Sequence, residues 1–225
     1  MHFHLPKPLH GWREFLGEVG IIVIGVLIAL GAEQVVRSVH AQQEVRDFRE
    51  AAGEEMGYDV AVYSDRMEQV PCVARRLDQL QDWLDLWKGG KRPTLLEPIT
   101  RPTYLYPRTN VWQSRTADLG DKLSLEQRVA YARFYDLLQT FNLTVEKERD
   151  VWSQIQDYSH AERLSDAELM KLGGLIDRAR QWQSFYRTNA VSFRKTAAQL
   201  GARKGSTEGD NWDPSLCKPL RWREG

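Results

Sequence analysis

The stretch VGIIVIGVLIALGA, residues 19–32, decides the fold because it contains no polar side chain. A helix rises about 1.5 Å per residue and the hydrocarbon core of a bilayer is about 30 Å thick, so this run needs its apolar flanks to cross a membrane. We therefore predict a transmembrane anchor over residues 12–36, preceded by a short tail of residues 1–11. The chain is predicted to be a single-pass membrane protein bound to the lipid bilayer.

Residues before the apolar run suit the membrane interface. Trp12 and Phe15 are predicted to lie in the aromatic belt, with Lys7 and Arg13 just outside it. A cleavable signal peptide is the alternative, because basic residues precede the run and Ala29-Leu30-Gly31 near its end offers small residues at a cleavage spacing. We expect an uncleaved signal anchor.

The orientation of the anchor is not decided by charge, because arginines also follow the helix at 37, 46 and 49. A short N-terminal tail followed by a long domain is the layout of a signal anchor. The prediction is a cytoplasmic N-terminus and a periplasmic domain at the inner membrane of a bacterium.

One side of the anchor is predicted to pack against another membrane helix. Steps of three and four residues place Glu18, Ile22, Gly25, Ala29 and Ala32 on that side. Gly25 and Ala29 form a small-xxx-small pair, which permits close approach of two helices. The alternative is that Glu18 reaches to the interface and the small residues reflect composition alone.

The remainder of the chain predicts an all-α fold, a helical soluble domain over residues 37–204. Apolar residues recur at helical spacing up to Pro71, and a second helix is expected over residues 71–88, with the proline in its first turn. Capping boxes at SLEQ, 124–127, and SDAE, 165–168, predict the starts of two more helices, and Gly201 predicts the end of the last. Four such helices with short connections indicate an antiparallel bundle.

A proline-rich segment, residues 91–109, separates these helices. Its four prolines exclude a helix and disfavour a central strand, so we expect an ordered crossover loop that packs Tyr104 and Tyr106. Long irregular loops are often functional, which makes this loop the candidate recognition surface. The alternative is a connector that only fills a groove.

The two cysteines, Cys72 and Cys217, are predicted to form a disulfide, because an even count in an exported domain favours pairing. The bridge would hold the C-terminal tail, residues 205–225. Two free thiols are the alternative.

Charge and motifs exclude several function classes. Lys+Arg 31 balance Asp+Glu 31, so the basic surface of a nucleic-acid-binding protein is not expected. The five histidines show no metal-ligand spacing, and the sequence holds no phosphate-binding, dinucleotide-binding or nucleophile-elbow motif. We predict no metal, no cofactor and no enzymatic activity.

The segment HLPKPLHGWREFLGEVGIIVIGVLIALGAEQ, residues 4–34, resembles the N-terminus of a group of bacterial single-pass membrane proteins whose domain has no known function. The resemblance implies an inner-membrane anchor followed by a helical domain, and it supplies no catalytic residues.

These features predict a non-catalytic accessory or structural subunit of a multi-subunit inner-membrane complex, such as a respiratory or photosynthetic one. Its partners would be other membrane-protein subunits or, as the lesser option, a second copy of the chain. The alternative function is a membrane-anchored helical bundle that binds a small ligand.

Overall fold

A computed structural model describes residues 11–115, 117–207 and 212–224. The chain divides into two compact units, Met1–Asp47 and Phe48–Gly225, and the second is called the helical domain below. Helix α1, Trp12–Lys88, belongs partly to each unit.

The first unit is the N-terminal part of α1. In the part of the chain that the structure describes, α1 is the one helix long and apolar enough to cross a membrane by length and composition. None of its most apolar window is buried, and side chains such as Ile21 (74% exposed) and Ile28 (67%) face outward. Its length and its apolar surface agree with the predicted anchor.

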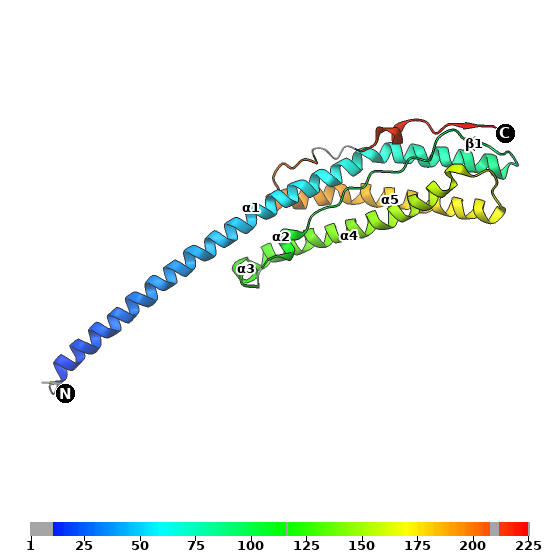
Figure 1. Ribbon diagram of the computed structural model, residues 1–225. Coiled ribbons are helices and arrows are strands. Elements are labelled where there is room, and N and C mark those ends of the chain that lie inside the picture. Colours follow the sequence, from blue (N-terminus) through cyan, green and yellow to red (C-terminus); the bar gives the residue numbers. More distant parts are fainter. Residues whose placement is uncertain (1–10, 116, 208–211, 225) are drawn as a thin grey trace, which may run out of the picture. The chain divides into compact units, whose positions relative to one another are not determined.

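The helical domain confirms the all-α prediction. Residues 48–88 of α1 lie alongside α4, Leu125–Gln156, and α5, Asp166–Gln199 (Figure 1). The 3-10 helix η1, Asp157–His160, lies in the short connection that turns α5 back against α4. Shorter elements complete the domain: α2, Asn110–Gln113; α3, Ala117–Lys122; η2, Pro214–Cys217; and the antiparallel strands β1, Thr94–Leu95, and β2, Trp222–Arg223.

The prediction of a separate helix over residues 71–88 is wrong, because Pro71 lies inside α1. A proline in a helix interior removes a hydrogen bond and costs about 3 kcal/mol. Pro71 is exposed, whereas Val70, Cys72 and Val73 beside it are buried. We infer that packing on both sides of the proline offsets this cost, so the described bundle has three long helices instead of four.

The predicted helix ends are confirmed. Ser124 and Gln127 form a complete capping box at the start of α4, and Ser165 and Glu168 form another at the start of α5. At the end of α5, Gly201 has a φ of +85°, and the Ala202 amide donates to the Ala197 carbonyl at 2.9 Å. This is the glycine-terminated helix end that the sequence predicts.

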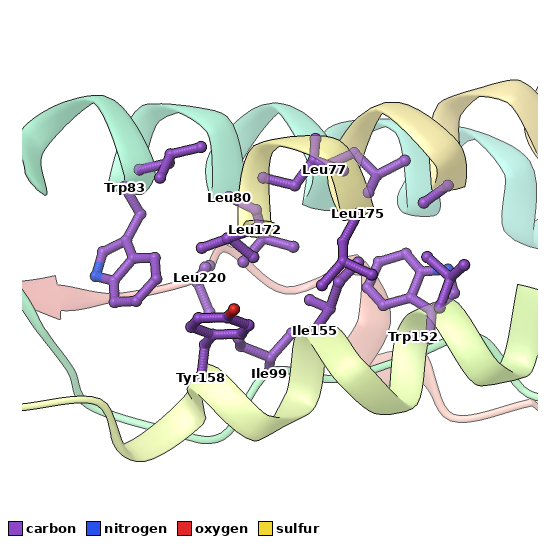
Figure 2. Packing of buried hydrophobic residues seen from close by; sticks show 14 of the residues in the cluster. Leu77, Leu80, Trp83, Ile99, Trp152, Ile155, Tyr158, Leu172, Leu175 and Leu220 are labelled. Atoms are coloured by element: carbon purple, nitrogen blue, oxygen red, sulfur yellow. The ribbon is translucent and has the colours of Figure 1, made fainter. Parts of the chain in front are cut away.

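The core at one end of the domain joins every major segment. In Figure 2, Leu77 and Leu80 of α1 point toward Ile155 of α4 and Leu172 of α5. The crossover loop adds Ile99 and the C-terminal segment adds Leu220, both buried. Further along the bundle the core is aromatic, with Tyr63, Phe134, Phe141, Tyr186 and Phe193 in ring contact.

Glycines let the C-terminal segment lie directly on α1. The Arg203 amide donates to the Gly53 carbonyl at 2.8 Å. A Cβ at Gly53 would lie 2.9 Å from the Gly201 carbonyl oxygen, and a Cβ at Gly57 would collide with the Arg203 carbonyl. The backbone at both places leaves no room for a side chain.

We expect Gly57→Ala to lower the free energy of unfolding by about 1–3 kcal/mol, because the new methyl group must push the Arg203 backbone away. Gly174→Ala is the matched control, since that position in α5 is exposed and nothing lies within 4 Å of a Cβ. Alanine there should raise stability by up to about 1 kcal/mol through helix propensity. Urea unfolding followed by circular dichroism measures both, and effects of equal sign would contradict this packing.

Candidate functional site

The crossover loop forms one wall of a cleft of about 640 Å³. Tyr104 and Tyr106, predicted as a recognition surface, both line it. Helix α4 contributes Arg149 and Gln156, and the C-terminal segment contributes Asp213 and Ser215. The crossover loop supplies the remaining lining residues: Glu97, Pro98, Ile99, Thr100, Arg101, Pro102 and Thr103. The volume lies within the range of about 300–1,000 Å³ found for small-molecule sites.

Hydrogen bonds fix the loop that lines this cleft. The Gln69 side chain accepts from the Thr103 amide at 2.9 Å and donates to the Thr103 carbonyl at 3.2 Å. Gln156 donates to the Ile99 carbonyl at 2.9 Å, and the Ile99 amide donates to the Ser159 hydroxyl at 3.0 Å. The part of the loop that lines the cleft is therefore a preformed surface, although it contains no helix or strand.

The two tyrosines occupy different environments. The Tyr104 hydroxyl is buried, and no hydrogen-bond partner for it lies in the described part of the chain. Burial raises the pKa of Tyr104 well above its usual value. Tyr106 is 39% exposed, and its hydroxyl accepts from Arg149 at 3.0 Å. Tyr104 is thus part of the cleft floor and Tyr106 part of its rim.

A fully buried ion pair lies beneath the loop. Glu148 accepts from Arg66 at 2.5 Å and from the Gln183 amide at 2.8 Å, and its other carboxylate oxygen accepts from the Tyr186 hydroxyl at 3.0 Å. The Arg66 guanidinium also stacks on the Tyr186 ring at 4.4 Å. The side chains of Arg66 and Glu148 are 3% and 0% exposed, so these charges tie the three long helices together out of reach of solvent.

Two carboxylates of α1 hold the end of the crossover loop. The Arg108 amide donates to Asp59 at 2.7 Å, while Glu55 accepts from the Val111 amide at 3.0 Å and from the Tyr135 hydroxyl at 2.8 Å. Burial raises the pKa of Asp59 to about 8; the hydrogen bond from the Arg108 amide opposes this rise, and the charge of Glu55 adds to it by a smaller amount. Asp59 therefore stays protonated at neutral pH.

The C-terminal segment is fastened to α1 by a disulfide and an arginine. Cys72 and Cys217 are paired, with Cα atoms 4.7 Å apart, as the sequence predicted. One nitrogen of the buried Arg76 donates to the Lys218 carbonyl at 2.9 Å and to the Ser215 carbonyl at 3.2 Å. Residues 205–225, expected to be a tail, thus place Leu216 and other side chains in the core.

We expect the protein isolated from an oxidising compartment to migrate faster on a non-reducing gel than after reduction, because the bridge closes a loop across a sequence separation of 145 residues. Cys217→Ser should abolish the difference, and Ser215→Ala, which leaves both cysteines in place, should keep it. Labelling of both cysteines by maleimide in the unreduced, denatured protein would contradict the bridge.

The predicted anchor residues all belong to the first unit. Glu18, Ile22, Gly25, Ala29 and Ala32 lie on α1 with exposed positions, and nothing lies within 4 Å of a Cβ built at Gly25. At the start of α1, the predicted interfacial residues Trp12, Arg13 and Phe15 are also exposed. Lys7 lies outside the described residues. Within its own unit, the predicted packing face is not covered by any described side chain.

Sequence reasoning missed the buried polar groups. Arg66 follows Tyr63 by three residues and Glu148 follows Val145 by three, so both charges occupy positions of the apolar stripes. A charged residue at a position of an apolar stripe was the signal that could have revealed each of them. The pairing of Arg66 with Glu148 could not be predicted, because the two residues are eighty-two positions apart in the sequence.

The chain matches no protein-family model, no curated protein and no solved structure. Among the described residues, no group of three or more His, Cys, Asp or Glu side chains has the arrangement of a metal site.

Proposed function

We propose that this protein is a membrane-anchored, non-catalytic accessory subunit of a multi-subunit bacterial inner-membrane complex. In this proposal the anchor packs against another subunit and the helical domain stands on the periplasmic side. The observation that carries the proposal is the uncovered apolar surface of α1 in the first unit, where side chains such as Ile21 and Ile28 are exposed. Such a surface requires lipid or other membrane helices.

The construction of the helical domain supports a bracing role. The buried charges Arg66 and Glu148 join α1 to α4, and Gln183 and Tyr186 of α5 complete the same network. The disulfide and Arg76 fasten the C-terminal segment. These polar groups serve cohesion of the fold, and a rigid domain is what a structural subunit needs.

The packing face of the anchor tests this function. We expect Gly25→Leu to stay inserted and folded but to lose its co-purifying partner, because a large side chain prevents close helix approach. Among the described residues, no atom lies within 4 Å of a Cβ built at Gly25, so we expect the clash to come from another molecule. Recovery of partner subunits after mild detergent extraction is the measurement.

Two controls make the test specific. Gly20→Leu is the same change at another open position of the same helix, and it lies off the predicted face. Ile24→Leu keeps both size and apolarity off that face. Equal partner recovery from all three variants and the unmodified protein would contradict the proposed packing face. Extraction of the protein from native membranes without any co-purifying subunit would contradict the accessory role.

A further inference from the structure

We propose that the crossover cleft binds a small organic carboxylate that carries an aromatic or other apolar body. This site is independent of the accessory role, since it involves no residue of the membrane anchor. The charges, the apolar floor and the rigidity of the cleft point to this class of ligand.

Arg101 is the cation available to a ligand. It is exposed at the cleft, and no carboxylate of the described chain lies within ion-pair distance of it. Its guanidinium carbon lies 5.7 Å from the centre of the Tyr104 ring, a cation–π contact that orients the group over the cleft floor. A guanidinium can donate two parallel hydrogen bonds to one carboxylate. This bidentate pairing strengthens binding of the carboxylate and fixes its orientation.

The other charges of the cleft already have partners. Glu97 lies 3.6 Å from Arg221, and Asp213 accepts from the amide of Ser215 at 2.8 Å and from its hydroxyl at 2.6 Å. Arg149 lies 2.8 Å from Glu146. Both acidic residues of the lining thus have partners within the chain, Glu97 a counter-charge and Asp213 two hydrogen-bond donors of Ser215, whereas Arg101 has no counter-charge, so we infer that an anion binds at Arg101.

The floor of the cleft favours an apolar body next to that anionic group. Pro102 lines it, and the half-buried Tyr104 ring lies beside Arg101. Gln69 and Gln156 hold this part of the loop by hydrogen bonds to its backbone, so a ligand would not have to order it. A preformed surface loses less entropy on binding, which suits a small molecule.

Ligand-observed NMR on the full chain in nanodiscs tests the proposal, with empty nanodiscs as background. Benzoate is the probe and benzamide its neutral analogue of the same shape. We expect benzoate to bind at least about tenfold more tightly, because the guanidinium donates charge-assisted hydrogen bonds to the carboxylate alone. Arg101→Gln should remove this preference, whereas Arg187→Gln, an exposed arginine of α5 outside the cleft lining, should keep it.

The carboxylate could belong to a free metabolite or to the C-terminus of a peptide. A second arm therefore compares the peptide Ala-Ala-Phe with its C-terminal amide. Carboxylate-dependent, Arg101-dependent binding of benzoate or of the free-acid peptide supports the site and identifies its source. Equal binding of charged and neutral probes, an unchanged preference in Arg101→Gln, or no binding of either anion above background would overturn it.

Discussion

Glu148→Gln should lower the free energy of unfolding of the helical domain by about 3–5 kcal/mol, because it leaves the buried Arg66 charge without its counter-charge. Glutamine has nearly the same shape as glutamate, so the loss would reflect charge and hydrogen bonding instead of a cavity. Tyr186 and Gln183 would also lose a charged acceptor. Urea unfolding of the full chain in detergent, followed by circular dichroism, measures the change.

Asp150→Asn is the control for this variant, because Asp150 is an exposed carboxylate two residues further along α4. It should change stability by less than about 0.5 kcal/mol, as surface substitutions usually do. Similar losses in the two variants would mean that the Arg66–Glu148 pair does not hold the bundle together.

The double variant Arg66→Met with Glu148→Met separates charge pairing from packing. Replacing both members of a buried ion pair by apolar residues is often neutral or stabilising, so this variant should recover most of the loss. The free energy of unfolding should not return fully to that of the unmodified protein, because Gln183 and Tyr186 would still lack the carboxylate that accepts their hydrogen bonds. A double variant less stable than Glu148→Gln would contradict this account.

Local sequence signals predicted the three long helices, and they predicted most helix ends correctly but placed a false boundary at Pro71. The capping boxes at Ser124 and Ser165 and the glycine at 201 act within a few residues, and all three were confirmed. Pro71 misled the prediction, because its effect depends on burial of residues on both sides, which is tertiary information. The short α2 and α3 were not predicted, since neither carries an apolar stripe long enough to detect.

Only some residues of the candidate site could be predicted from the sequence. Tyr104 and Tyr106 were identified because the surrounding prolines exclude a helix, and Arg101 lies in the same segment. Arg149 and Asp213 reach the cleft from α4 and from the C-terminal segment, so their contribution depends on how the chain folds back. The structure shows that arrangement, whereas apolar periodicity reports only which residues face inward.

A second large effect is expected from pH, and its origin is Asp59. The pKa of this carboxyl is raised by burial from 3.8 to about 8 in the folded chain, so between these values the folded state holds a proton that the unfolded state has released. Stability must then fall as pH rises through this window. At about 1.4 kcal/mol per pH unit, the full span from 3.8 to about 8 corresponds to about 6 kcal/mol.

Asp59→Asn tests this dependence, because asparagine resembles the protonated acid and cannot ionise. We expect the variant to be more stable than the unmodified protein at pH 9 and to lack the decline between about pH 4 and pH 8, since its side chain still offers an oxygen to the Arg108 amide. Asp82→Asn, at an exposed position of α1, should leave the decline intact. Urea unfolding at pH 5, 7 and 9 gives the comparison. Parallel stability curves for the unmodified protein and Asp59→Asn would contradict the raised pKa, because they would show that Asp59 is already ionised in the folded domain at neutral pH.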